Sequence, residues 1–311
     1  MSNPLKAILQ TCLNIKNGEK VLIIADKNTE NIAHKILHEA VKITNSSLKM
    51  IPIGKHNGDE PPTNIAKEML HYDVIIAPTT TSLTHTKAVL NAKKNNARVA
   101  TMPGITEKIM NGSLLADYKK IERFTKNVLE KLNDSVKIKV TTTAGSDFSF
   151  SVNGRNWLPD TGIISKKGTC TNLPAGEVFV SPLEGSFNGK IVLDIFKHEG
   201  ETYAARGSLI EVKNGKVVSC SDKPSKVNSY FKNIKNADNI AEFGIGTNYK
   251  AKIIGNILQD EKVLGTCHVA FGNNSSIGGK VYSKLHLDTV LQKPTIIVDD
   301  VVLMKGGKFL L

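Results

Sequence analysis

The stretch KVLIIAD, residues 20–26, decides the fold of the first part of the chain. It is a continuous apolar run that ends in an acid, which is typical of a strand buried on both faces of a parallel sheet. Further apolar stretches with strand character follow it, separated by segments whose apolar residues recur at helical spacing. Strands that alternate with helices predict an α/β domain with a doubly wound parallel sheet.

The neighbouring segments extend this alternation. We expect helices over 1–18, 29–44, 63–70, 84–95 and 105–134, and strands over 20–26, 48–52, 73–77 and 97–101. The first strand runs into ADKNTENIA without the GxGxxG fingerprint, so a dinucleotide cofactor is not expected. The hydroxyl-rich segment PTTTSLTHT, residues 78–86, could bind an anion or cap the next helix, and capping is the favoured interpretation.

From Val136 onward the pattern changes to alternating apolar and polar residues. Residues 137–142 and 147–152 alternate in this way and are followed by an Asn-Gly turn at 153–154. Residues 160–162 and 172–177 are loop-rich, and Glu177 opens a strand over 178–180. Further strands are expected over 190–195, 202–212 and 216–219, with a helix over 224–235 and a final hairpin near 305–308. We therefore predict an N-terminal α/β domain (1–135) and a C-terminal mixed, largely antiparallel α+β domain (136–311) that carries the site.

Composition excludes several classes of protein. The formal net charge is +12, and it is spread evenly, with +6 in residues 1–135 and +6 in 136–311. An even spread is not the clustered basic surface of a nucleic-acid binder. The four cysteines are far apart without a CxxC pair, which argues against a zinc ribbon or a secreted disulfide framework. No signal peptide or membrane-spanning run is apparent, so a cytoplasmic protein without nucleic-acid or membrane partners is expected.

Residues 242–288 contain a candidate metal site. Positions i and i+2 of a strand face the same side, so His286 and Asp288 in KLHLDTV can reach one ion together. His268 lies in a second strand-like run, TCHVAF. Glu242 precedes Phe-Gly-Ile-Gly, where we expect a strand to give way to a loop. Two imidazoles and two carboxylates suit zinc, cobalt, manganese or iron(II) better than magnesium.

The structural alternative for each histidine is a hydrogen-bonded core residue, which is the commoner role for a single histidine in an apolar run. The pair His286 and Asp288 is harder to explain in that way, because an acid buried on the same strand face needs a partner.

Several long segments carry a resemblance to a known family. They are SLTHTKAVLNAKKNNARVATMPGIT (82–106), SDFSFSVNGRNWLPDTG (146–162), NLPAGEVFVSP (172–182), AEFGIGTN (241–248), GNILQDEKVLGTCHVAFGNNSS (255–276) and HLDTV (286–290). In these segments the chain resembles the thermophilic metallo-aminopeptidases around aminopeptidases T and S, over most of its length.

The resemblance implies metal ligands at Glu177, Glu242, His268, His286 and Asp288, in a two-metal site with Glu242 as the bridge. It also implies a homodimer. Two departures concern the substrate pocket: the longer peptidases carry a tyrosine shortly after the motif histidine, where this chain has Asn-Asn-Ser-Ser at 273–276, and the interval from 268 to 286 is shorter here.

Hydrolysis is the natural chemistry of such a dinuclear site, because two zinc, cobalt or manganese ions acidify a bridging water and polarise a carbonyl. A carboxylate then moves the proton of that water, and Glu242 and Glu177 are the candidates for this catalytic role. The resulting hypothesis is a metallo-aminopeptidase that removes leucine-like N-terminal residues from peptide substrates.

Two alternatives use the same residues differently. His268, His286 and Asp288 alone form the two-histidine, one-carboxylate set of mononuclear iron(II) oxygenases. Relatives of this family are similar to ring-cleaving dihydroxypyridine dioxygenases, which makes iron(II) the cofactor under this alternative. The other alternative is a non-catalytic protein with a structural metal, although closed structural zinc sites rely on Cys and His rather than carboxylates.

Overall fold

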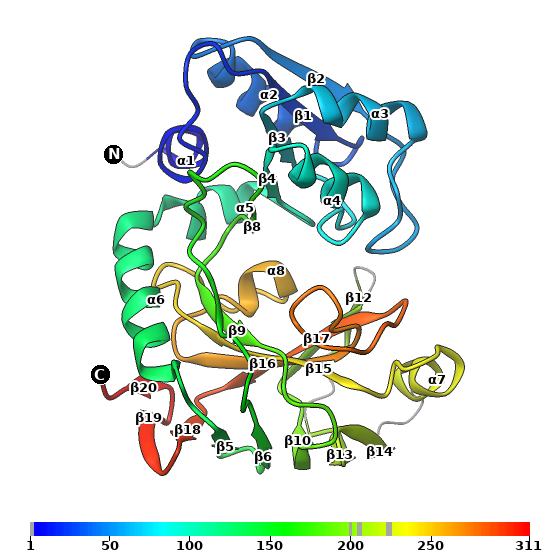
Figure 1. The fold of residues 1–311 in the computed structure, drawn as a ribbon, viewed down its shortest axis with the longest axis vertical. Helices are drawn as coiled ribbons and strands as arrows, with labels where there is room; N and C mark the ends of the chain where they lie inside the picture. The colour runs from blue at the N-terminus through cyan, green and yellow to red at the C-terminus, as the bar shows by residue number, and fades with distance from the viewer. Residues whose placement is uncertain (1–2, 199–200, 204–206, 222–225) are drawn as a thin grey trace. The chain divides into compact units, whose positions relative to one another are not determined.

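The structure is a computed structural model that describes residues 3–198, 201–203, 207–221 and 226–311. The chain folds into two compact units, each of which has its own sheets (Figure 1). The first unit comprises Met1–Arg123, Asp160–Gly176 and Asn248–Lys252, and the second comprises Phe124–Pro159, Glu177–Thr247 and Ile253–Leu311. The units therefore interleave along the sequence.

The helices within the described residues are short, apart from α2 and α6. The α-helices are α1 (Pro4–Lys6), α2 (Glu30–Ala40), α3 (Thr63–Glu68), α4 (Lys87–Lys94), α5 (Glu107–Met110), α6 (Tyr118–Leu132), α7 (Lys226–Asn233) and α8 (Ile257–Asp260), with a π-helical segment at Ala7–Cys12 and 3₁₀ turns at Met69–His71 and Ser113–Leu115. None of the helices in the described part of the chain is both long and apolar enough to span a bilayer.

The first unit contains a parallel sheet in the strand order β2-β1-β3-β4-β8. Its strands are β1 (Val21–Ala25), β2 (Ser46–Met50), β3 (Val74–Ala77), β4 (Arg98–Thr101) and β8 (Cys170–Asn172). All five residues of β1 are buried, as the apolar run at 20–26 predicts. The Thr86 side chain caps α4 by accepting a hydrogen bond from the Val89 amide, so capping is confirmed for this member of the hydroxyl-rich segment. The predicted α/β class is confirmed.

The strand β8 is not predicted from the sequence, and its last residue, Asn172, lies in a segment expected to be loop. This strand joins the edge of the parallel sheet beside β4. It has three residues and only one of them, Thr171, is buried. The hydroxyl of Thr171 donates a hydrogen bond to Asp160. A strand this short and polar has no apolar periodicity from which it could be recognised.

The single helix expected over 105–134 is also a wrong prediction. The structure has α5, a 3₁₀ turn and α6 in its place. Gly112 adopts φ −119° and ψ −100°, and Ala116 is extended. Two non-helical residues within six positions end one helix and start another, because the i to i−4 hydrogen bonds cannot continue through them.

The second unit contains two antiparallel sheets. The larger has the order β14-β13-β10-β6-β5-β18-β19-β20, and the other has the order β12-β11-β17-β16-β15-β9-β7. The strands are β5 (Lys137–Thr141), β6 (Asp147–Ser151), β7 (Leu158–Asp160), β9 (Glu177–Val180), β10 (Asn188–Val192), β11 (Ile195–His198), β12 (Glu201–Tyr203), β13 (Leu209–Lys213), β14 (Lys216–Cys220), β15 (Ile240–Gly246), β16 (Thr266–Gly272), β17 (His286–Gln292), β18 (Thr295–Val298), β19 (Val301–Lys305) and β20 (Lys308–Phe309). The predicted switch to largely antiparallel structure is confirmed. The strand expected over 202–212 is divided between β12 and β13, and its residues 204–206 lie outside the described residues, as do residues 224–225 of the helix expected over 224–235.

A shared apolar core joins the two antiparallel sheets. Phe150 from the larger sheet stacks on Phe187 with ring centroids 5.2 Å apart, and it contacts Phe243 of β15 at 5.0 Å. Phe243 is fully buried. On β15 the residues on either side of Phe243, Glu242 and Gly244, face the opposite side of the sheet. Packing of one face against the aromatic core therefore fixes the strand that carries Glu242.

A buried ion pair in the first unit gives a stability prediction. Arg98 is 5% exposed in its side chain and donates two hydrogen bonds of 2.9 Å to the Glu19 carboxylate. Burial alone would raise the pKa of Glu19, but the hydrogen bonds from Arg98 and from the Lys16 amide outweigh it and lower the pKa. We expect Glu19→Gln to reduce the free energy of unfolding by ~3 kcal/mol, because it leaves a buried guanidinium without its counter-charge.

Urea unfolding at several pH values tests this prediction. A lowered pKa in the folded state stabilises the protein above the unfolded-state pKa and is lost as pH falls through the folded-state value. The difference between wild type and Glu19→Gln should therefore be full at pH 7 and shrink below about pH 4. Glu107→Gln removes an exposed pair with Lys35 and serves as the control, with an expected change within ~0.5 kcal/mol. Equal effects of both substitutions would contradict the prediction.

Candidate metal centre

Four neighbouring strands of the seven-stranded sheet carry the predicted site residues. β9 and β17 flank the pair β15 and β16, and all neighbours run antiparallel. The register places Gly246 opposite Glu177, Gly244 opposite His268, and Ala270 opposite Asp288. Residues far apart in sequence are thereby brought to one region of a single sheet.

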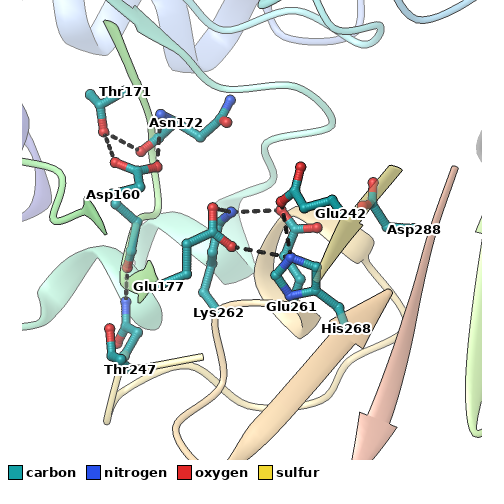
Figure 2. Close-up of polar contacts among 12 residues, drawn as sticks. Asp160, Thr171, Asn172, Glu177, Glu242, Thr247, Glu261, Lys262, His268 and Asp288 are labelled. Atoms are coloured by element: carbon teal, nitrogen blue, oxygen red, sulfur yellow. Dashed lines mark hydrogen bonds and ion pairs between the residues drawn. The ribbon is translucent and has the colours of Figure 1, made fainter. Parts of the chain in front are cut away.

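The five predicted residues form one cluster, and Figure 2 shows four of them with their neighbours. The Nε2 atom of His268 lies 3.3 Å from Glu242 Oε1 and 3.6 Å from Glu177 Oε2. The Nε2 atom of His286 lies 3.5 Å from Asp288 Oδ1 and 3.6 Å from Glu242 Oε2. Both imidazoles therefore contact the same carboxylate, that of Glu242.

The position of Glu242 differs from the sequence prediction. It is the third residue of the seven-residue strand β15 and does not lie where a strand ends. The Gly-Ile-Gly that follows allows close packing instead of forming a turn. A Cβ at Gly244 would lie 2.1 Å from the His268 ring, and one at Gly246 would lie 2.1 Å from the Val263 carbonyl oxygen. The glycines let the imidazole and the chain before β16 approach the strand.

Two further residues of the cluster were not found from the sequence. Glu261 and Lys262 follow α8 directly, and Lys262 is only 1% exposed. The ammonium of Lys262 pairs with Glu177 at 2.6 Å and with Glu261 at 2.7 Å. A run such as QDEKV normally indicates a solvated surface, and it has no periodicity or spacing that separates a buried lysine from an exposed one. Its nearness to the TCH strand was the only available signal.

His286 is oriented from outside the cluster. Its Nδ1 lies 3.0 Å from the Asn273 carbonyl oxygen, which can accept a hydrogen bond from this nitrogen and leave Nε2 to act as a ligand. Histidines that bind metals commonly have such a partner. The next residue, Asn274, is fully buried and donates hydrogen bonds to Ser181 and Glu184. The Asn-Asn stretch that departs from the resembled peptidases is thus part of the support for His286.

The carboxylates of the cluster raise the pKa values of both histidines. Burial would lower the pKa of His268, but the Glu242 hydrogen bond and the charges of Glu177 and Glu261 raise it to about 9. Burial would also lower the pKa of His286, and Asp288 and Glu242 raise it to about 10. The carboxylates therefore attract positive charge strongly, and a bound divalent ion would displace these protons.

The carboxyl groups respond to the same environment in opposite directions. Burial would raise the pKa of Asp288, but the charge and hydrogen bond of His286, together with the charges of His268 and Lys262, outweigh burial and lower it. For Glu261, burial raises the pKa and dominates over the Lys262 ammonium, which lowers it. Asp288 is thus held as the charged carboxylate that a metal ion requires.

The donor set fits a metal ion. Among the described residues, Glu261, His268 and Asp288 can each offer one ligand atom within 4.8 Å of the others. The buried Nδ1 of His268 has no hydrogen-bond partner within the part of the chain that the structure describes, and leaving a buried polar atom unsatisfied costs roughly 1–3 kcal/mol. Nitrogen and oxygen donors of this kind are typical of a transition-metal or zinc site.

Comparisons with known proteins give two different likenesses. A family model described as 2,5-dihydroxypyridine 5,6-dioxygenase matches residues 1–311. The solved structure of 2,5-dihydroxypyridine dioxygenase from Pseudomonas putida KT2440 is similar at 17% sequence identity and a TM-score of 0.85, over 99% of this chain and 96% of that chain. Wild-type AmpT from Thermus thermophilus is similar at 15% identity and a TM-score of 0.72, over 99% of both chains. No curated protein matches the chain significantly. At these identities the structural likenesses show the fold alone.

Proposed function

The chain belongs to the 2,5-dihydroxypyridine 5,6-dioxygenase family, and from that premise and the geometry of the cluster we propose that it is an iron(II) dioxygenase that opens a dihydroxylated pyridine ring. The reaction inserts both atoms of O₂ into the ring and breaks the carbon–carbon bond between positions 5 and 6. The observation that carries the proposal is the convergence of two imidazoles and Asp288 within a partly buried, anionic cluster.

The aminopeptidase expectation is wrong. The family model covers the whole chain and describes a dioxygenase, so the enzyme is an oxidoreductase and not a hydrolase or protease acting on peptides. The resemblance to aminopeptidase T reflects a shared fold, which AmpT shows at 15% identity. A common fold can hold different reactions, because the reaction depends on the residues of the site.

We assign the iron(II) ligands to His268, His286 and Asp288. This is the two-histidine, one-carboxylate set of non-haem iron oxygenases. His286 has the Asn273 carbonyl behind it to fix its ring. Glu261 lies near His268 and Asp288, but its carboxylate is paired with Lys262 at 2.7 Å. His268 and Asp288 belong to either ligand set, and the third ligand is His286 or Glu261. We assign His286, because the Glu261 carboxylate is already paired with Lys262.

Bound iron(II) would supply the redox centre at which O₂ and the ring react, which no side chain of the cluster can supply. The chain supplies the surroundings. Glu242 contacts both imidazoles and is the carboxylate that takes the proton released by a ring hydroxyl. Glu177 is committed to the ion pair with Lys262, so we assign the base role to Glu242.

An oxygen-uptake assay tests the proposed function. Protein stripped with a chelator and reloaded with iron(II) should consume one O₂ for each 2,5-dihydroxypyridine ring lost. The zinc-loaded protein should consume none, because zinc has no redox chemistry. Neither form should cleave leucine anilide. Ring loss without oxygen uptake, or anilide cleavage by the zinc form, would overturn the proposal.

A further inference from the structure

Lys262 is an unusual residue to find beside a metal centre. Its side chain is 2% exposed, and its ammonium lies 2.6 Å from Glu177 and 2.7 Å from Glu261. Removing an ammonium and two carboxylates from water is costly unless their geometry is close to ideal. A lysine in this position therefore needs an explanation beyond filling space.

The backbone around Lys262 holds it in place. The carboxylate of Asp260 accepts hydrogen bonds of 2.8 Å from the amides of Ile254 and Gly255. The chain at 262–263 packs against Gly246 so closely that a Cβ there would lie 2.8 Å from the Lys262 carbonyl carbon. The backbone at Lys262 is thus fixed in place, and its buried ammonium is held by Glu177 and Glu261.

The charges of the cluster show what the ammonium replaces. Four carboxylates meet here, those of Glu177, Glu242, Glu261 and Asp288. When all four are ionised, one divalent ion and the Lys262 ammonium together neutralise three of the four negative charges. Without the ammonium, two divalent ions would be needed to neutralise the cluster, and the pair Glu177 and Glu261 would offer oxygen ligands for the second.

We propose that the Lys262 ammonium occupies the place of a second cation and limits the centre to one metal ion per chain. This inference rests on the proposed function only in that the cluster binds a metal ion. An ion bound by Glu177 and Glu261 would lie within a few ångströms of Nζ, where like charges repel. Lys262 therefore acts on the metal stoichiometry of the centre and is not a ligand.

Metal counting on charge variants tests this inference. Stripped protein is equilibrated with increasing free Mn(II), and the bound metal per chain is measured by elemental analysis. Wild type should saturate at one ion and Lys262→Gln at two. Lys262→Arg keeps the charge and should stay at one. The double variant Lys262→Gln with Glu177→Gln removes a ligand of the second ion and should return to one. Lys216→Gln is the matched control, because it removes a lysine that pairs with Asp238 on the surface.

The outcomes separate this inference from the proposed function. Lys262→Gln saturating at one ion, or wild type binding two, would overturn the role of Lys262 and leave the dioxygenase proposal standing. Two ions in Lys262→Arg would show that charge is not the cause and would also overturn it. Wild type binding no ion would overturn both proposals. If stripped Lys262→Gln does not fold, the count is made on chains refolded with Mn(II), and two ions per folded chain is again the expected result.

Discussion

Replacing His268 with alanine is expected to abolish iron binding and ring cleavage together. His268 is 1% exposed, belongs to both possible ligand sets, and contacts Glu242 and Glu177. Loss of an outer partner of a metal ligand costs roughly 10–100-fold in affinity or activity, so loss of the ligand itself should exceed about 100-fold. Iron content after dialysis and the rate of oxygen uptake are the two measurements.

The choice of the third ligand is decided by a matched pair of variants. His286→Ala should lose iron as His268→Ala does, whereas Glu261→Gln should keep it. If Glu261→Gln loses iron and His286→Ala retains it, the set of Glu261, His268 and Asp288 holds the ion and our assignment is incorrect. Circular dichroism of each stripped variant shows whether the fold persists without metal.

Replacing Gly244 with alanine is expected to have the second largest effect. The new methyl group would lie 2.1 Å from one ring carbon of His268 and 2.2 Å from Nε2. The imidazole must move away, because the methyl is fixed to the backbone of β15. We expect a loss of iron affinity of at least ~100-fold, as for a ligand whose position is no longer held. Overpacking of this kind also lowers stability by roughly 1–3 kcal/mol.

A double variant separates the clash from a general strand defect. If the methyl acts through the His268 ring, removing the ring in Gly244→Ala with His268→Ala should restore most of the stability lost in Gly244→Ala alone. The comparison is made on stripped proteins by thermal unfolding. The account of this glycine would be contradicted if the stability losses of Gly244→Ala and His268→Ala simply added in the double variant. Full iron affinity in Gly244→Ala would also contradict it.

Periodicity explains which parts of the fold and site could be predicted. The buried run at 20–26 and the alternating run at 137–142 indicate strand type directly, because the burial of a strand determines its pattern. The alternation of side chains along a strand also predicts that His286 and Asp288 share one face. In the structure the Nε2 atom of His286 lies 3.5 Å from Oδ1 of Asp288. The short polar strand β8 could not be predicted, because it forms only by pairing with β4, which is distant in sequence.

Long-range packing explains what the sequence could not show. The pattern of Gly244 and Gly246 is typical of a turn. In the structure the missing side chains instead leave room for the His268 ring and for the chain before β16. Glu261 and Lys262 look like solvated charges until the fold buries them beside Glu177. The main functional expectation is wrong for a related reason: the ligand types of the cluster suit hydrolysis as well as ring cleavage, and the sequence does not show that Lys262 is buried among them.

Isotope labelling of the product tests the central claim most directly. Iron-loaded protein is incubated with 2,5-dihydroxypyridine under ¹⁸O₂, and the ring-opened product is examined by mass spectrometry. A dioxygenase transfers both atoms of one O₂ molecule, so the product should carry two heavy oxygens. A product whose new oxygen comes only from water would show hydrolytic chemistry and would contradict the account.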